Sequence, residues 1–351
     1  MLLELGYNVK FLLIVDNNIG QEDIDLNTHF WGDKLILYKR KKIDKIRIIW
    51  ANKFYFRLFM NMPLDYLYPS GLTQFLKTLQ NEDKFDIVLS NYIFLSKSFS
   101  AFSSGVKKLL YTHDSFSERY SKTGNKGYSV TKIAESRALN RADIILSIQD
   151  EERVFFNSLT NKKVITCFTY FPLHISNNLE NKVLLFIASD NIHNQKGIRE
   201  FVTQYFPLIK RKVIDIKLLI GGSICSKIQD LNAIEDIEFF GYVDDLLEFY
   251  NKGNVVVNPV SCGTGFKIKS FEALSFGKIL ISNTHNTIGI YDKVNSPIIE
   301  ADTPIEFADK IAALFEKNTI EVYKKASLDY VNRFNINVKN KFIEAIEEDI
   351  I

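Results

Sequence analysis

The chain has 351 residues, which is enough for two domains of ordinary size, each with its own hydrophobic core. Hydrophobic residues make up 46% of it and charged residues 25%, a composition typical of globular and not of disordered proteins. The 44 basic and 42 acidic residues leave a formal net charge of +2, which argues against a dedicated nucleic-acid-binding protein.

The cysteines and the apolar runs indicate a cellular compartment. Cys167, Cys225 and Cys262 are an odd number at wide spacing, so they predict neither a disulfide framework nor a metal cluster. No run of about 18 apolar residues occurs, and the first residues do not follow the order of a signal peptide. We therefore expect a cytoplasmic protein that does not span a membrane.

Short apolar runs rich in β-branched residues alternate with helical patterns along the chain, as in parallel α/β domains. In the first half the pattern predicts strands at residues 9–15, 34–38, 87–89, 108–111, 144–147 and 163–167. In the second half it predicts strands at residues 183–188, 216–220, 237–240, 255–258 and 279–282, and a final helix at about 338–348.

The first residues, MLLELGYNVKFLL, resemble the end of a first helix followed by the second strand of a doubly wound domain. The first strand of such a domain lies in the middle of the sheet, so its loss would leave two strands without a partner. Two explanations stay open: the native start lies upstream of Met1, which we favour, or the sheet is rearranged.

The most informative segment is residues 255–277. A buried strand of three valines is followed by a turn containing Gly263 and Gly265, and then by a helix that carries Lys267, Lys269 and Glu272. Free N–H groups at a helix start and two lysines favour an anion, and a carboxylate can accept two ribose hydroxyls. The alternative is an ordinary strand-to-helix junction with solvated lysines.

The run CGTGFKIKSFEALSFGK at residues 262–278 resembles the nucleotide-sugar signature of GT-B glycosyltransferases in the large retaining family four. Residues 183–201 and 237–245 resemble the first strand and helix, and the base-contacting loop, of the same family's donor domain. The resemblance implies an α/β fold of two Rossmann-like doubly wound domains that face a cleft. We expect an acceptor-side domain at 1–173 without its first strand, a linker at 174–182, a donor domain at 183–336 and a helix at 337–351 that crosses back to the first domain.

The resemblance also implies site residues. The catalytic candidates are His113, Lys267 and Glu272. The donor-binding candidates are Asp114, Asn191, Lys196, Tyr242, Val243, Gly263, Thr264, Gly265, Phe266, Lys267, Ile268, Lys269 and Glu272.

His113 and Asp114 come just after the predicted strand 108–111, and ligands of open α/β sheets bind at the carboxyl ends of strands. By resemblance, His113 orients the donor sugar or its phosphate, with help from Arg119. The alternative is a histidine that caps a turn. Gln149 and Glu151 are weaker candidates, because polar and acidic residues at a helix start ordinarily interact with the helix dipole.

The chain departs from the family at two positions. Many relatives place an arginine where Asn191 stands, so only Lys196 remains of a basic pair, and Lys267 or Lys269 would supply the missing charge. The family's first glutamate, eight residues before the second, is replaced by Thr264, and only Glu272 remains.

These residues predict transfer of a hexose-type sugar from a UDP- or GDP-sugar, with retention of configuration, to a glycan or lipid-linked glycan acceptor in bacterial surface polysaccharide synthesis. No cofactor or metal is expected, because Asp244 and Asp245 open a predicted helix and are better explained as an N-cap. A non-catalytic GT-B subunit that stabilises a partner enzyme is the alternative. A dehydrogenase is weaker still, because no Gly-x-Gly-x-x-Gly run follows a first strand.

Residues 39–47 form a basic cluster, and residues 53–60 are basic and aromatic. Together they suit an anionic membrane surface, which predicts peripheral attachment at the inner face of the plasma membrane. Solvated charges beside packed aromatics are the open alternative.

Overall fold

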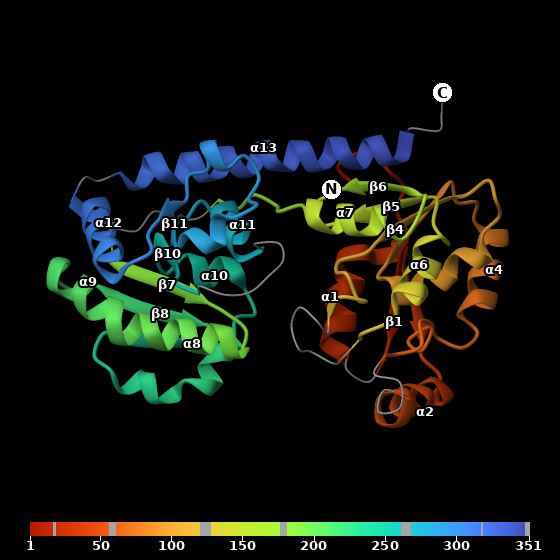
Figure 1. The fold of residues 1–351 in the computed structure, drawn as a ribbon, viewed down its shortest axis with the longest axis horizontal. Coiled ribbons are helices and arrows are strands. Elements are labelled where there is room, and N and C mark those ends of the chain that lie inside the picture. The colour runs from red at the N-terminus through yellow and green to blue at the C-terminus, as the bar shows by residue number, and fades with distance from the viewer. Residues whose placement is uncertain are drawn as a thin grey trace. The chain divides into compact units, whose positions relative to one another are not determined.

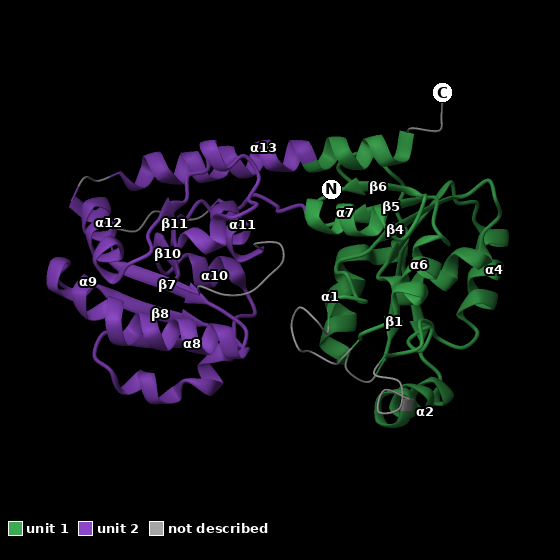
Figure 2. Ribbon diagram, in the orientation of Figure 1, with its two compact units in different colours: residues 1–169, 338–351 green, residues 170–337 purple. Residues whose placement is uncertain are grey.

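The computed structural model describes residues 1–16, 19–55, 61–119, 128–175, 181–260, 268–316 and 319–347. The chain divides into two compact units (Figure 2). Unit 1 contains Met1–Thr169 and Val338–Ile351, and unit 2 contains Tyr170–Asn337.

Unit 2 contains one parallel six-stranded sheet with the order β12-β11-β10-β7-β8-β9. Its central strands are buried along most of their length, because the sheet has helices on both faces and its strands are apolar at nearly every position. The strands are β7 (Val183–Ile187), β8 (Lys217–Gly221), β9 (Ile237–Gly241), β10 (Val255–Asn258), β11 (Ile279–Ser282) and β12 (Ile299–Glu300).

The helices of unit 2 pack against this sheet (Figure 1). One core combines strand residues with side chains of α8 (Ile192–Glu200), α9 (Phe206–Lys212) and α12 (Pro304–Glu316). A second group of aromatic rings joins Phe271 of α11 (Ile268–Ser275) to Tyr330 and Phe334 of α13 (Ile320–Glu347). The short helix α10 (Leu246–Tyr250) buries Phe249 and Tyr250.

Unit 1 contains two separate parallel sheets. The larger has the order β3-β4-β5-β6 and the smaller pairs β1 with β2. The strands are β1 (Phe11–Val15), β2 (Leu35–Lys39), β3 (Ile87–Asn91), β4 (Lys107–Tyr111), β5 (Ile144–Ser147) and β6 (Lys163–Thr166). The longer helices are α1 (Gln21–Trp31), α2 (Lys42–Trp50), α4 (Leu72–Glu82), α6 (Lys132–Leu139) and α7 (Asp150–Asn157).

The sheet of unit 1 is divided among the described residues at the place where a central strand was expected to be missing. Within the described residues, β1 pairs only with β2, and β3 pairs only with β4. A doubly wound sheet places its first strand between the second and the fourth, which here are β1 and β3. All five residues of β1 are apolar, as in a strand covered on both faces, yet none of them is fully buried.

The predicted strands are all present, and their ends differ from the prediction by at most two residues. The strand β12, which has two residues and lies at the edge of its sheet, was not predicted. The last helix, α13, begins at Ile320, well before the predicted start at about residue 338.

Candidate functional site

Part of the predicted donor site lies outside the described residues. Cys262, Gly263, Thr264, Gly265, Phe266 and Lys267 belong to this part. The structure describes the helix that follows them, α11, from Ile268, which is half exposed, to Ser275. Two of the charged candidates, Lys269 and Glu272, lie on this helix.

The ammonium group of Lys269 is held by a neutral side chain. Its Nζ donates a hydrogen bond to Oδ1 of the buried Asn194 across 2.8 Å. Asn194 in turn donates from Nδ2 to the backbone oxygen of Ser189 at 2.9 Å, so its side chain has a fixed orientation. Burial lowers the pKa of Lys269 to about 8, and the nearby Glu272 carboxylate opposes this shift. Lys269 is therefore a cation at neutral pH whose charge is incompletely solvated, a state that an added phosphate would stabilise.

Asn191 and Lys196 have different places on α8. The Asn191 side chain accepts a hydrogen bond from the backbone N–H of Asn194 at 2.9 Å, so it is the N-cap of this helix. Asn191 thus begins the helix that carries Asn194. Lys196 lies further along α8 with its side chain exposed.

The carboxylate of Glu272 is held by a tyrosine from another helix. The hydroxyl of Tyr250 donates to Oε1 of Glu272 across 2.8 Å, and Tyr250 is fully buried. Burial raises the pKa of Glu272, whereas the hydrogen bond from Tyr250 and the charge of Lys269 lower it. Burial and the same carboxylate raise the pKa of Tyr250, so its proton stays on the hydroxyl and is donated.

The loop after β9 carries Tyr242, Val243 and the two aspartates. Tyr242 is 73% exposed, which leaves its ring available to a ligand. Asp245 accepts a hydrogen bond from the backbone N–H of Leu247 at 2.8 Å, so its interpretation as the N-cap of α10 is confirmed. Among the described residues, no group of three or more histidine, cysteine or acidic side chains is arranged to hold a metal ion.

In unit 1, His113 lies at the carboxyl end of β4 in a constrained conformation. Its φ is 62°, a value that residues other than glycine adopt rarely. The imidazole lies near the rings of Tyr92 and Tyr111, with centroids 4.6 and 4.3 Å away, and Nε2 is 2.8 Å from Oδ1 of Asn91. Burial lowers the pKa of His113, so the ring is neutral at pH 7.

The turn after His113 is fixed by two carboxylates. Asp114 pairs with Arg119 at 2.8 Å. The buried Glu135 of α6 accepts hydrogen bonds from the backbone N–H groups of Phe116 and Ser117 at 2.8 and 3.0 Å. Glu135 thereby holds the backbone that follows the histidine.

The other acidic and polar candidates of unit 1 begin a helix. Gln149 occupies the N-cap position of α7 without a side-chain capping bond, and the exposed Glu151 lies in the first turn. This placement is the ordinary one for such residues.

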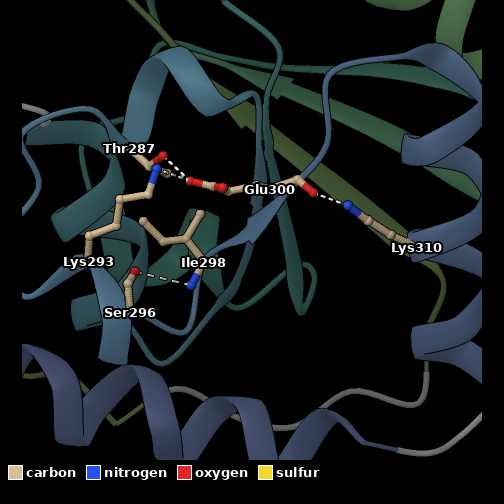
Figure 3. Close-up of a pocket in the computed structure, with 6 residues that line it drawn as sticks. All are labelled: Thr287, Lys293, Ser296, Ile298, Glu300 and Lys310. Carbon is tan, nitrogen blue, oxygen red and sulfur yellow. Dashed lines mark hydrogen bonds and ion pairs between the residues drawn. The ribbon is translucent and has the colours of Figure 1, made fainter.

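A cavity of about 310 Å³ lies beside β12, lined by Thr287, Lys293, Ser296, Ile298, Glu300 and Lys310 (Figure 3). None of these is a predicted site residue. Lys293 forms an ion pair with Glu300 at 2.8 Å, and Thr287 donates to the same carboxylate. Lys310 donates to the backbone oxygen of Glu300. Lys293 of this cavity is therefore already paired with a carboxylate, whereas Lys269 of α11 is hydrogen-bonded to a neutral asparagine.

Four residues of the two sites were not found by sequence reasoning: Asn91, Glu135, Asn194 and Tyr250. Asn91 is the last residue of β3. It could have been predicted in the same way as His113, because ligands bind at the carboxyl ends of parallel strands. The other three act through partners distant in the sequence, and no local pattern marks them.

Comparison with known proteins defines the class to which this architecture belongs. The structure of TarM superimposes with a TM-score of 0.56 at 15% identity, covering 80% of this chain and 59% of TarM. The pneumococcal O-GlcNAc transferase GtfA, solved in complex with UDP and GlcNAc, gives 0.55 at 18% identity, covering 79% of this chain and 59% of GtfA. HepE of Anabaena, solved in complex with UDP, gives 0.60 at 11% identity, covering 97% of this chain and all of HepE. The fold is therefore GT-B, as expected.

The sequence comparison identifies unit 2 more closely. Residues 181–317, which lie within unit 2, match the family model described as Glycosyl transferases group 1. The match includes both Lys269 and Glu272. A search of curated proteins gave no match. This chain spans about three fifths of the length of TarM and GtfA.

Proposed function

We propose that the protein is a glycosyltransferase that uses a nucleoside-diphosphate sugar as donor. The observation that carries the proposal is the pair Lys269 and Glu272 on α11, within the group 1 domain. A partly desolvated ammonium suits a diphosphate, and a fixed carboxylate suits the two hydroxyls of a ribose. The complexes of GtfA and HepE with UDP support uracil as the base.

In the proposed mechanism, positive groups stabilise the charge that develops on the departing diphosphate. Lys269 supplies one full charge, and Lys196 and Lys267 are the further candidates. Electrostatic stabilisation of this kind is usually the largest single contribution to catalysis. His113 is proposed to orient the donor sugar as a neutral imidazole, because burial lowers its pKa. We further propose transfer with retention, without a metal or other cofactor, to a glycan or lipid-linked acceptor of a bacterial surface polysaccharide.

The test of donor use is calorimetric titration with UDP, GDP and their sugars. A hydrogen bond to a charged group is worth roughly 1.5–3 kcal/mol, so Glu272→Ala should weaken binding by about ten- to a hundredfold. Glu316→Ala, which removes an exposed glutamate from α12, is the matched control and should bind as the wild type does. Equal affinity of Glu272→Ala and wild type would contradict the assigned role.

We also propose that the protein is cytoplasmic and attaches to a membrane surface. The exposed face of α2 supports this attachment. Ile43, Ile46, Ile49 and Trp50 are between 53% and 63% exposed, and they recur at the spacing of one helix face. Lys42 of the same helix and Lys53 of the helical segment 51–55 that follows it are also exposed. Apolar side chains bordered by lysines suit the interface of an anionic bilayer, where a lipid-linked acceptor would be found. No helix in the described part of the chain has the length and apolar character to cross a bilayer.

Vesicle sedimentation tests this attachment. We expect binding to vesicles containing phosphatidylglycerol and not to pure phosphatidylcholine, with affinity that falls as salt is raised. The double variant Ile46→Ser, Ile49→Ser should lose binding. Ile192→Ser, Ile305→Ser removes two equally exposed isoleucines from unit 2 and should retain it.

A non-catalytic GT-B subunit remains the second candidate, because the divided sheet of unit 1 leaves one edge of β1 and one edge of β3 unpaired among the described residues. The calorimetric titration separates the two candidates. A folded protein that binds no nucleotide or nucleotide sugar would favour the subunit.

A further inference from the structure

The contact between Tyr250 and Glu272 joins two helices of unit 2. Tyr250 is the last residue of α10, and Glu272 lies in the middle of α11, 22 residues later. The tyrosine side chain is completely buried, and its hydroxyl donates to Oε1 of the carboxylate at 2.8 Å. A buried hydroxyl needs a partner, so this bond determines the position of both groups.

The ring of Tyr250 cannot readily turn away from the carboxylate. It stacks on Phe276 with centroids 4.5 Å apart and an interplanar angle of 24°, and Phe249 contacts it edge-on at 5.6 Å. Phe276 stacks in turn on His174, with centroids 4.1 Å apart and planes 4° from parallel. The hydroxyl is thus held at the end of a column of three rings.

The hydrogen bond from Tyr250 uses only part of the acceptor capacity of the Glu272 carboxylate. A tyrosine hydroxyl donates one hydrogen, whereas an ionised carboxylate offers two oxygens with about four acceptor positions. Donation to Oε1 fixes the plane of the group and leaves the second oxygen as an acceptor. A carboxylate held in this way loses less rotational freedom when it binds two neighbouring hydroxyls.

We propose that Tyr250 is a positioning residue, whose hydroxyl holds the Glu272 carboxylate in the orientation that accepts hydrogen bonds from the ribose of a nucleoside diphosphate. The inference rests on the proposed function and names a residue that acts on the ligand only through Glu272. If it is correct, removing the Tyr250 hydroxyl weakens the contact between Glu272 and the ribose, and the other contacts of the nucleotide are unchanged.

The experiment compares UDP with 2′-deoxy-UDP by calorimetry, using wild type and Tyr250→Phe. The wild type should bind 2′-deoxy-UDP about tenfold more weakly than UDP, since one hydrogen bond to a charged group is lost. In Tyr250→Phe this ratio should fall to about threefold or less, because the carboxylate is no longer fixed. The comparison is a double-mutant cycle between the tyrosine hydroxyl and the ribose hydroxyl. If the protein prefers guanine, GDP and 2′-deoxy-GDP replace the uridine pair.

Tyr330→Phe is the matched control. It removes a second buried tyrosine hydroxyl from the same unit, one that donates to the backbone oxygen of Tyr291. We expect it to lower the thermal midpoint as Tyr250→Phe does, while the ratio of the two dissociation constants stays at the wild-type value. Incorporation of 3-fluorotyrosine at position 250 retains the ring and the donor, so the ratio should be preserved. This variant also serves if Tyr250→Phe does not fold.

The outcomes distinguish the inference from the proposed function. A wild-type protein that binds no nucleoside diphosphate overturns both. Binding of UDP with no discrimination against 2′-deoxy-UDP, or equal discrimination in wild type and Tyr250→Phe, overturns the inference alone. Loss of discrimination in the 3-fluorotyrosine protein would overturn it as well.

Discussion

The ammonium group of Lys269 donates to the side chain of Asn194, and this hydrogen bond joins α11 to α8. Asn194 is itself fixed, because its amide donates to Ser189 and its backbone N–H is capped by Asn191. Two uncharged asparagines therefore determine where a cation of the candidate donor site lies. Asn191 thus supports Lys269 indirectly, through Asn194.

Nucleotide binding should depend on pH in a way that reports on Lys269. Its pKa is lowered to about 8, so the group is charged below pH 8 and loses its charge as the pH rises. We expect the dissociation constant for UDP to increase between pH 7.5 and pH 9. Lys269→Arg, whose guanidinium stays charged, should remove most of this change. A parallel increase in the two proteins would show that another group is responsible.

Asn191 should matter for stability as a helix cap. Asn191→Ala removes the acceptor for the backbone N–H of Asn194 and should cost about 1 kcal/mol of stability. Asn191→Gly should cost only a few tenths of a kcal/mol, because glycine leaves the helix start accessible to water. Chemical denaturation of unit 2 measures both values. Identical losses for alanine and glycine would exclude capping as the main contribution.

Gly197 should not tolerate a side chain. A Cβ at this position would lie 2.9 Å from Cγ2 and 3.1 Å from Cα of Val260, so α8 or the segment after β10 would have to move. We expect Gly197→Ala to destabilise unit 2 by about 1–3 kcal/mol. Gly105→Ala is the control, because no atom lies within 4 Å of its Cβ, and its stability should be unchanged or slightly higher. The thermal midpoints of the two variants provide the test.

The buried charge of Lys278 should destabilise the folded protein, and replacement by methionine should remove this cost. The side chain is 1% exposed, and burial, with a contribution from Lys324, lowers its pKa to about 8. Lys278→Met keeps the shape without the charge and should stabilise the fold by about 1–3 kcal/mol at pH 7.

The sign of the pH dependence gives a second test of Lys278. The unfolded chain holds this proton up to about pH 10.5, so the stability of the wild type rises with pH between about 8 and 10.5. The advantage of Lys278→Met should therefore be full below pH 8 and shrink above it. Urea denaturation at pH 7 and pH 9.5 measures the difference, and an advantage that grows with pH would contradict the assignment.

His113 should titrate below the ordinary range of histidine. Burial lowers its pKa, so lowering the pH through 6.5 favours the unfolded chain, which binds the proton more tightly. Asn91→Asp places a carboxylate 2.8 Å from Nε2 and should raise the pKa of His113. NMR titration of the imidazole measures both values. An unchanged pKa in Asn91→Asp would show that the two side chains do not interact in solution.

The fold was largely predictable because local patterns determine parallel strands. Runs such as Phe11–Val15 and Val255–Asn258 are apolar and rich in β-branched residues, and both form strands at the predicted place. The start of α13 could also have been predicted. Its buried residues recur every three or four positions from Ser327 to Ile346, the spacing of one helix face, so the periodicity begins well before the predicted start.

The candidate site was only partly predictable. Lys269 and Glu272 were found because they lie in one short motif. Their supports were not found, because Asn194 precedes Lys269 by 75 residues and Tyr250 precedes Glu272 by 22. Such pairs arise from the way helices pack on a sheet. No local sequence motif marks Asn194 or Tyr250.

The divided sheet of unit 1 has a consequence for how the protein behaves at high concentration. The edges of β1 and β3 carry N–H and C=O groups that no strand in the described chain occupies. Open, apolar strand edges recruit other strands, since each added strand gains a ladder of hydrogen bonds. Copies of this chain should therefore pair with one another through these edges. Soluble oligomers and then aggregates should form as the concentration rises, unless an extended segment covers the edges.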